Sequence, residues 1–248
     1  MDQVLLITGG GRGIGAATAL LAAKRGYAVA VNYASNSLAA DEVVRTVRAG
    51  GGTAMAVQAD VGDEAQVLAM FAKIDAKLGR LTALVNNAGV VDVQARVDEM
   101  SVARMERMFR INVIGSFVCA REAVKRMSTK YGGAGGAIVN ISSGAARIGS
   151  PGQYVDYAAS KAAIDTLTIG LAKEVAMEGI RVNAVRPGVI KTEIHASGGD
   201  PGRAERIGAT APLGRAGEAE EIANAILWLA SDEAAYVSGA ILDVAGGR

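Results

Sequence analysis

The alternation of short β-branched runs with longer amphipathic segments constrains the fold of this 248-residue chain most strongly. The runs are apolar at successive positions, which is typical of strands buried on both faces of a parallel sheet. Parallel strands need long crossovers, so the intervening segments predict helices on both faces. We expect an α/β fold with a doubly wound parallel sheet in three αβα layers, as a single domain over 1–248. The predicted strands are 4–8, 28–32, 54–58, 83–86, 137–141, 181–185 and 240–244, and the predicted helices are 15–25, 37–49, 64–78, 101–127, 157–177 and 218–230.

The net charge, the numbers of Cys and His, and the lengths of the apolar stretches argue against several classes of protein. The formal net charge is +1, so no long-range field favours nucleic acid or an anionic membrane surface. A single Cys and a single His supply neither an internal disulfide nor a zinc-type metal site. The chain runs into its first strand without a basic leader, and no apolar stretch approaches the roughly 18 residues of a membrane helix. We expect a soluble, cytoplasmic protein without metal.

A segment rich in Gly, Pro and charged residues, 188–215, interrupts the alternating pattern. It follows the strand predicted at 181–185, and ligands of α/β sheets bind at the carboxyl ends of strands. Long irregular segments in compact domains are usually lids or binding loops. We therefore expect a substrate lid, with a tolerated surface insertion as the alternative.

The Gly-rich sequence at 8–15, TGGGRGIG, lies between the first predicted strand and the first predicted helix. Glycines there permit positive φ angles and let a pyrophosphate approach the backbone closely. The beginning of the helix offers unpaired N–H groups and a partial positive charge to phosphate groups. This position favours nucleotide binding over a merely geometric tight turn. The residues expected at the cofactor here are Gly9, Gly11, Arg12, Gly13, Ile14 and Gly15.

The end of the second predicted strand bears on which nucleotide is bound. NAD sites usually place an Asp or Glu on the adenosine ribose, and 31–36, VNYASN, contains no acid. Polar side chains there can donate hydrogen bonds to a 2′-phosphate, and Arg12 can add a positive charge. NADP(H) is therefore favoured, with NAD(H) as the alternative if Arg12 is only solvated. The residues expected at this phosphate are Asn32, Tyr33, Ser35 and Asn36.

Tyr157 and Lys161 are four residues apart in a helix-like segment, which places them on one helical face. A free phenol has a pKa near ~10, too high for acid–base work at neutral pH. A Lys ammonium about 4 Å away would lower the phenol pKa by roughly three units at an effective dielectric constant of about 20. We therefore expect Tyr157 to titrate near neutrality, unless the pair is a chance arrangement on a surface helix.

Two further polar positions are candidates for the same site. Ser142 and Ser143 close the strand predicted at 137–141, where side chains face the crevice that binds ligands. A serine hydroxyl there can meet a substrate carbonyl, and ordinary turn chemistry is the alternative. Asn112 interrupts the apolar stretch 109–114, and its amide needs hydrogen-bond partners. For Asn112, a core hydrogen bond and a functional role are equally compatible with the sequence.

These motifs occur in an order that resembles the short-chain dehydrogenases/reductases. TGG and GIG at 8–15, NNAG at 86–89, Asn112, Ser142-Ser143, Tyr157 with Lys161, and Pro187-Gly188 follow one another over the whole chain, as does the closing 243–247. Each motif alone is weak, but the ordered set is highly specific. The chain is similar to the single-domain members with a Rossmann fold, such as 3-oxoacyl carrier-protein reductases and glucose dehydrogenases.

The resemblance implies an oxidoreductase that moves hydride between NADP(H), or NAD(H), and a small-molecule ketone or secondary alcohol. Tyr157 would be the general acid/base, and Lys161 would hold the nicotinamide ribose and lower the Tyr157 pKa. Ser143, rather than Ser142, would orient the carbonyl, and Asn112 would hold a water in a proton relay to Lys161. Family members are usually homo-oligomers, so a tetramer or dimer is expected. Further cofactor contacts implied by the resemblance are Asp60, Val61, Asn86, Ala88, Gly89, Pro187, Gly188, Ile190 and Thr192.

A nucleotide-sensing protein that kept the fold but lost turnover is the alternative function. Such proteins usually lose the catalytic Tyr, Lys or Ser, and all three are present here. The residues of the expected lid do not indicate which substrate is bound. Its His195, the only histidine, is either solvated or a substrate contact.

Overall fold

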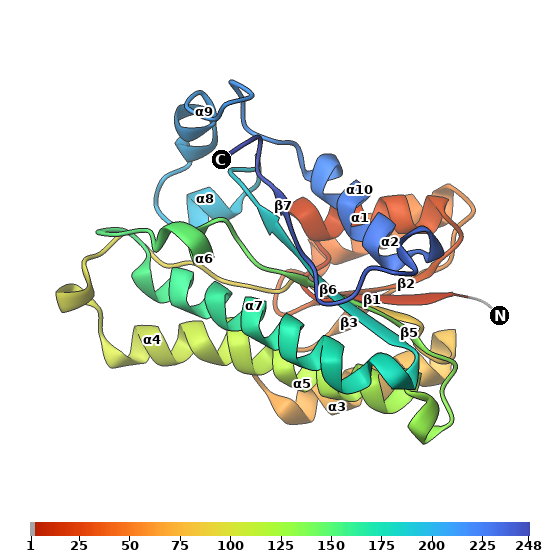
Figure 1. The fold of residues 1–248 in the computed structure, drawn as a ribbon. Helices are drawn as coiled ribbons and strands as arrows, with labels where there is room; N and C mark the ends of the chain where they lie inside the picture. Colours follow the sequence, from red (N-terminus) through yellow and green to blue (C-terminus); the bar gives the residue numbers. More distant parts are fainter. Residues whose placement is uncertain (1–2) are drawn as a thin grey trace.

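Seven parallel strands form one sheet in the computed structural model, which describes residues 3–248 (Figure 1). The order β3-β2-β1-β4-β5-β6-β7 reverses direction between β1 and β4, which confirms the doubly wound fold. All seven strands were predicted to within two residues at each end. Their bounds are β1 Val4–Ile7, β2 Ala28–Tyr33, β3 Ala54–Gln58, β4 Ala83–Asn86, β5 Gly136–Ile141, β6 Ile180–Pro187 and β7 Ile241–Val244.

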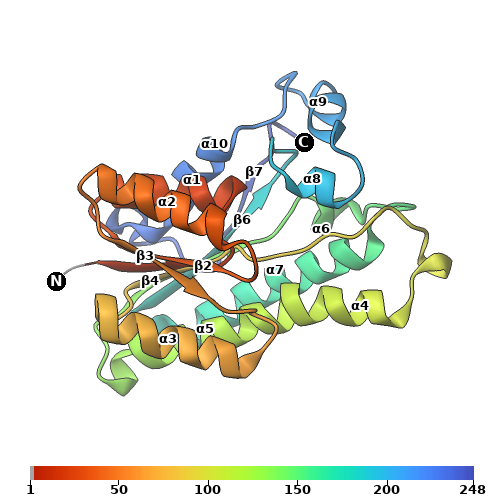
Figure 2. The same cartoon turned by 180° about the vertical axis from the view of Figure 1, so that it is seen from behind.

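Helices cover both faces of the sheet, and a separate apolar core lies on each side. On one face lie α1 (Gly13–Lys24), α2 (Ser37–Ala49) and α10 (Ala219–Ala230), and Figures 1 and 2 show all three on the same side. On the other face lie α3 (Glu64–Leu78), α4 (Val102–Phe109), α5 (Gly115–Met127) and α7 (Val155–Val175). Short 3-10 turns occupy Val97–Glu99, Thr129–Tyr131, Ala176–Glu178 and Asp232–Ala234. Within the described chain, no helix combines the length and apolar character needed to cross a membrane.

The helix predicted over 101–127 differs from expectation at its centre. A π-helical turn, Arg110–Ile114, joins α4 to α5. Such a turn adds one residue to the helical repeat, so side chains after it shift to a new face. Asn112 lies within the turn and is buried. Hydrophobic periodicity alone does not distinguish this turn from regular α-helix.

The segment 188–215 contains two short helices, α8 (Ile194–Ser197) and α9 (Arg203–Gly208). It leaves β6 at the carboxyl edge of the sheet. Figures 1 and 2 show α8 and α9 on the same side as the small helix α6 (Ala145–Ile148) and one end of α7. The irregular segment therefore lies at the edge where the strands end, as the sequence predicted.

Candidate active site

A cleft of about 900 Å³ opens at the carboxyl edge of the sheet. Its walls are the Gly-rich turn after β1, the ends of β2, β4, β5 and β6, the first turns of α7, and the segment 188–215. Six basic residues and two acidic residues line it. The cleft brings together all the predicted site residues except Gly15, Asn86 and Asn112.

The Gly-rich turn has the backbone shape that glycine makes accessible. Gly9 has φ +62° and Gly13 has φ +50°. A Cβ on Gly15 would lie 2.5 Å from the Gly9 carbonyl oxygen, so any larger residue there would push the turn away from α1. Gly15 therefore acts by close packing and not as part of the cleft wall. The helix begins at Gly13, and no side chain caps it, so its first N–H groups are available to a ligand.

The Asn32 side chain forms hydrogen bonds to the backbone of this turn and of the segment after β3. Its Oδ1 accepts a hydrogen bond from Gly9 N at 3.1 Å, and its Nδ2 donates to Ala59 O at 3.0 Å. Both ends of the Asn32 amide are thus engaged within the protein, and a contact of this residue with a 2′-phosphate stays a prediction. Asn36 differs, since its Oδ1 caps α2 by accepting from Ala39 N at 3.1 Å, which leaves its Nδ2 available as a donor.

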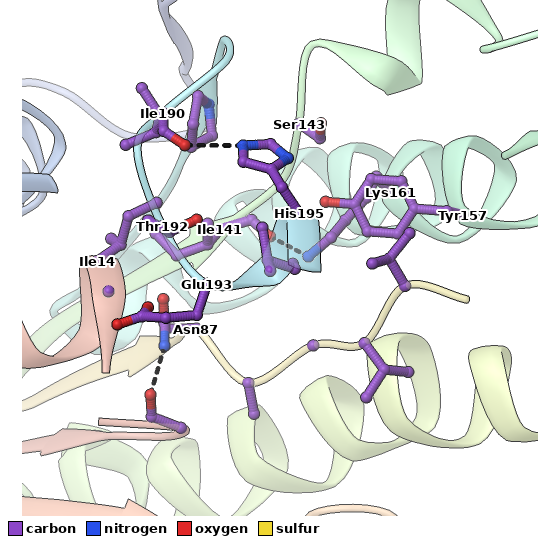
Figure 3. A pocket seen from close by; sticks show the side chains of 18 of the residues that line it. Ile14, Asn87, Ile141, Ser143, Tyr157, Lys161, Ile190, Thr192, Glu193 and His195 are labelled. Atoms are coloured by element: carbon purple, nitrogen blue, oxygen red, sulfur yellow. Dashed lines mark hydrogen bonds between the residues drawn. The ribbon is translucent and has the colours of Figure 1, made fainter. Parts of the chain in front are cut away.

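At the end of β4 the structure distinguishes two neighbouring asparagines. Asn86 is buried and donates to Asn140 Oδ1 at 2.9 Å, away from the cleft where it was expected. Asn87 lines the cleft, and its Nδ2 donates to Thr8 O at 2.9 Å and Gly9 O at 3.0 Å (Figure 3). Consecutive strand residues point to opposite faces, which explains the difference. Sequence reasoning missed Asn87, although the amide doublet was visible.

Tyr157, Lys161 and Ser143 meet at the other end of the cleft (Figure 3). Tyr157 lies in the first turn of α7, and Lys161 Nζ lies 5.7 Å from the centre of its ring. Lys161 Nζ donates to Ile141 O at 2.7 Å, at the last residue of β5. Ser143 is half-buried in the cleft wall, whereas Ser142 is buried and donates its hydroxyl to Lys161 O at 3.2 Å. Of the two serines, Ser143 is the one free to meet a substrate.

Burial dominates the titration of the Tyr-Lys pair. It lowers the pKa of Lys161 from 10.5 to about 8, and the nearby Asp165 carboxylate opposes this change. Burial also raises the pKa of Tyr157 above its usual 10.0, with the Ser143 hydroxyl acting in the opposite direction. The expected lowering of the Tyr157 pKa by Lys161 is thus not found. The ammonium donates to the Ile141 carbonyl, and its Nζ lies 5.7 Å from the centre of the Tyr157 ring.

Asn112 lies behind the cleft wall. Its Oδ1 accepts from Val90 N at 2.8 Å, and its Nδ2 donates to Val90 O at 3.0 Å and Ser160 Oγ at 3.1 Å. A Cβ on Gly89 would lie 3.4 Å from both Asn112 Oδ1 and Lys161 Nζ, so Gly89 separates these two groups. The amide therefore fixes the segment after β4 against α7. Its role in a water relay stays a prediction.

A buried ion pair that the sequence did not reveal holds the first turn of α7. Asp156 Oδ2 accepts from Arg104 Nε at 2.7 Å, and its Oδ1 accepts from Arg104 Nη2 at 3.2 Å. The same Oδ1 accepts from Tyr157 N at 2.9 Å. The Asp156 side chain is only 2% exposed. The position of Tyr157 thus depends on a partner 52 residues away, on α4.

The segment 188–215 is joined to the residues that precede α7. Tyr154 Oη donates to Gly198 O at 3.3 Å, and Arg203 Nη2 donates to Gln153 Oε1 at 2.9 Å. His195 Nε2 lies 2.8 Å from Ile190 O, and Figure 3 shows its ring between Ile190 and the Ser143–Tyr157 end of the cleft. The side chain of His195 therefore borders the space in which a substrate would sit.

No cluster of three or more His, Cys, Asp or Glu side chains arranged to hold a metal ion occurs among residues 3–248. Cys119 is buried in α5, and desolvation raises its pKa to about 12, so its thiol is not a nucleophile at neutral pH.

Known proteins with similar sequences and structures are oxidoreductases. Residues 9–248 match the family model described as enoyl-(acyl carrier protein) reductase. The uncharacterized oxidoreductase YgfF of Escherichia coli is 58% identical over 245 residues, covering 99% of both chains. Cis-4-hydroxycyclohexanecarboxylate dehydrogenase of Sinomonas cyclohexanicum and 3-oxoacyl-[acyl-carrier-protein] reductase of Synechocystis are each 41% identical over 246 residues, covering 99% of this chain and 96% of theirs. A mutant short-chain dehydrogenase/reductase of Serratia marcescens superposes with a TM-score of 0.90 at 35% identity, covering 99% of this chain and 97% of its own.

The Arg104–Asp156 pair predicts a specific pattern of stability. Arg104→Gln should lower the free energy of unfolding by about 3 kcal/mol, because it leaves a buried carboxylate without its cation. Adding Asp156→Asn should restore part of that loss, since a neutral amide is less costly to bury than a charge. Urea unfolding of the single and double variants measures both effects.

Arg96→Gln is the matched control, because Arg96 pairs with Asp98 in a bridge whose side chains are 72% and 64% exposed. This control should change stability by less than about 0.5 kcal/mol. A cost for Arg104→Gln no greater than that of Arg96→Gln would contradict the buried-pair account.

The lowered pKa of Lys161 predicts how stability depends on pH. Between about pH 8 and about pH 10 the unfolded chain binds more protons at this residue than the folded chain, so its contribution to stability rises with pH. Exposed tyrosines ionise in the upper part of that range in wild type and variant alike, so the comparison with Lys161→Met isolates the lysine. Wild type should gain about 2 kcal/mol relative to Lys161→Met across this window. Denaturant unfolding at several pH values tests this, with exposed Lys173→Met as the control. Identical profiles for the two variants would refute it.

Proposed function

Because the chain belongs to the short-chain dehydrogenase/reductase family, an oxidoreductase family, we propose that it interconverts a ketone and a secondary alcohol with NADP(H), using Tyr157 as the general acid/base. One observation carries the proposal. The Gly-rich turn and the Tyr157–Lys161–Ser143 group lie at opposite ends of one cleft. That arrangement fits a phosphate group at one end and a reacting carbonyl at the other.

The shape of the cleft fits a nicotinamide dinucleotide. Gly9 and Gly13 give the turn its positive φ angles, and a pyrophosphate can lie against the uncapped start of α1. When bound, the nicotinamide supplies or takes up the hydride. Gly11, Arg12 and Ile14 would lie at the diphosphate; Asp60 and Val61 at the adenine; and Ala88, Gly89, Pro187, Gly188, Ile190 and Thr192 around the nicotinamide.

Three side chains would handle the proton. The Ser143 hydroxyl orients the carbonyl, and the Tyr157 hydroxyl donates its proton to the carbonyl oxygen as negative charge develops there. In the oxidative direction the proton returns from the alcohol to the phenolate. The raised pKa of Tyr157 keeps the phenol protonated at neutral pH, which suits its role as a proton donor. Lys161 uses one N–H on Ile141 O, which leaves two for the ribose hydroxyls of the cofactor.

The preference for NADP(H) rests on fewer groups than the sequence suggested. The amide of Asn32 is engaged within the protein, whereas Asn36 uses only its Oδ1. Tyr33 and Ser35 line the cleft beside the exposed Arg12, and no acid stands at the end of β2. A 2′-phosphate would thus meet a guanidinium, two hydroxyl groups and the Asn36 amide nitrogen, without a carboxylate to repel it.

The names of two relatives support a carbonyl or alcohol substrate, because one denotes a 3-oxoacyl reductase and the other a hydroxycyclohexanecarboxylate dehydrogenase.

We also propose a cytoplasmic homo-oligomer, a tetramer or a dimer. Large apolar side chains are exposed on the helices of one face, as expected for a contact between copies. These are Val102, Phe109, Ile114, Phe117, Val155 and Ile169.

Tyr157→Phe should reduce turnover by about 10²- to 10⁴-fold, because it removes the proton donor. Binding of NADPH should survive, since most cofactor contacts lie elsewhere in the cleft. The measurement is NADPH oxidation with a panel of sugars, quinones, diketones, steroids and acyl thioesters, beside cofactor fluorescence. The control is Tyr131→Phe, because Tyr131 is exposed and does not line the cleft. Rates in Tyr157→Phe equal to those of wild type would sink the assignment. NADPH binding without reduction of any carbonyl would favour the nucleotide-sensing alternative.

Arg12→Ala should raise the Kd for NADPH by about 10- to 100-fold, the expected cost of losing a charge-assisted hydrogen bond. The Kd for NADH should change by less than about threefold, because NADH lacks the 2′-phosphate. Fluorescence titration of both cofactors measures this. Arg25→Ala removes an exposed arginine at the other end of α1 and serves as the control. Equal losses for the two cofactors would rule out Arg12 as the basis of a preference.

A further inference from the structure

Arg203 lies in the segment 188–215 and lines the cleft together with Tyr154. Its guanidinium carbon lies 5.2 Å from the centre of the Tyr154 ring, and its Nη2 donates to Gln153 Oε1 at 2.9 Å. Tyr154 precedes Tyr157 by three residues, about one helical turn. The Arg203 side chain is only 17% exposed. A cation is therefore held in a fixed orientation against Tyr154, at the start of the helix that carries the proposed proton donor.

One end of this guanidinium has no partner. Arg203 Nη1 is buried and makes no hydrogen bond. The nearest carboxylate oxygen, Asp200 Oδ2, is 3.9 Å away, beyond hydrogen-bond distance, and it accepts a hydrogen bond from Arg206. Gln94 also approaches this oxygen, at 3.4 Å. Buried polar groups in folded proteins almost always have partners, so an unpartnered guanidinium nitrogen calls for one supplied by a ligand.

Two other arginines that line the cleft, Arg107 and Arg147, already pair with carboxylates. Arg107 Nη1 lies 3.4 Å from Asp92, and Arg147 Nη1 lies 2.9 Å from Asp243. Both are about half exposed, so solvent also satisfies them. Arg203 differs in being desolvated while its own acid lies too far away to bond. A buried, oriented guanidinium binds a carboxylate more strongly than a solvated one.

We infer that the substrate is an oxo acid or the corresponding hydroxy acid, and that Arg203 binds its carboxylate. This inference rests on the proposed function and adds the chemical class of the substrate. The carbonyl carbon accepts the hydride and its oxygen accepts the Tyr157 proton, while the carboxylate at the far end of the molecule stays unchanged. Because the Tyr154 ring and Gln153 hold the guanidinium in place, binding requires little reordering of this side chain.

Arg203 also joins the lid to the loop before α7, so its removal could act through lid closure alone. The two roles give different kinetics. A loosened lid affects charged and uncharged substrates alike, whereas loss of a carboxylate partner affects only the charged ones. Pairs of substrates that differ by the charge alone therefore separate the two roles.

The experiment compares 4-oxopentanoate, 5-oxohexanoate and 4-oxocyclohexanecarboxylate with their primary amides, using NADPH and purified full-length protein. Wild type should prefer the best acid over its amide by about tenfold or more in kcat/KM. Arg203→Gln should lower kcat/KM for that acid by about 10- to 100-fold and for the amide by less than about threefold. The loss for the acid should appear mainly in KM, because the carboxylate contact is made in both ground and transition states.

Two control variants sharpen the result. Tyr154→Phe removes the hydrogen bond to Gly198 O but leaves the guanidinium, so it should change acid and amide by the same factor. Lys191→Gln removes a positive charge from the same segment, at an exposed side chain paired with Glu218 outside the cleft, and should change neither rate.

Equal rates for acid and amide in wild type would overturn the inference, as would equal losses for both in Arg203→Gln. If neutral carbonyls are reduced and no oxo acid is preferred, the substrate class is wrong but the proposed function stands. If no carbonyl of either kind is reduced with NADPH or NADH, the proposed function fails, and this inference fails with it.

Discussion

The hydrogen bond from Lys161 Nζ to Ile141 O is the interaction on which the arrangement of the active site depends. It joins α7 to the end of β5, and Ser142 strengthens the joint by donating to Lys161 O. Two candidate groups, Ser143 on the strand side and Tyr157 on the helix side, take their relative position from this joint. Burying an ammonium to make it is costly, and the lowered pKa of Lys161 is the expression of that cost.

A second constraint acts at the other end of the cleft, where the side-chain amides of Asn32 and Asn87 form hydrogen bonds to the backbone of Gly9. Asn32 accepts a hydrogen bond from Gly9 N, and Asn87 donates to Gly9 O. Both polar groups of the Gly9 backbone are thereby satisfied while its φ stays at +62°. The side chains come from β2 and from the residue after β4, the two strands beside β1. The Gly-rich turn, the proposed phosphate site, therefore has its shape without a ligand, which reduces the ordering that binding would require.

Sequence periodicity predicted the strands and the layers because burial on both faces leaves a local signature in each strand. Spacing likewise predicted that Tyr157 and Lys161 share a helical face. What failed were orientations and charges that depend on distant residues. The Asn32 side chain is oriented by its hydrogen bond to Gly9 N, and the Lys161 ammonium by its hydrogen bond to Ile141 O. The Asp156 carboxylate is oriented by its ion pair with Arg104. The sequence neighbours of those groups carry no trace of such partners, so the direction of the Tyr157 pKa could not be predicted from spacing.

The first turn of α7 connects the catalytic group to two other parts of the molecule. Asp156 binds Arg104 of α4, and the residues just before Tyr157 bind the lid through Gln153 and Tyr154. The helix α4 and the π-helical turn after it also carry exposed apolar side chains. An oligomer built on that face would hold α4 in place and, through the buried ion pair, hold the turn that carries Tyr157. Closure of the proposed lid would act on the same turn through Gln153 and Tyr154. Assembly and substrate enclosure would then stabilise a single catalytic geometry, although neither contributes an atom to the proton transfer.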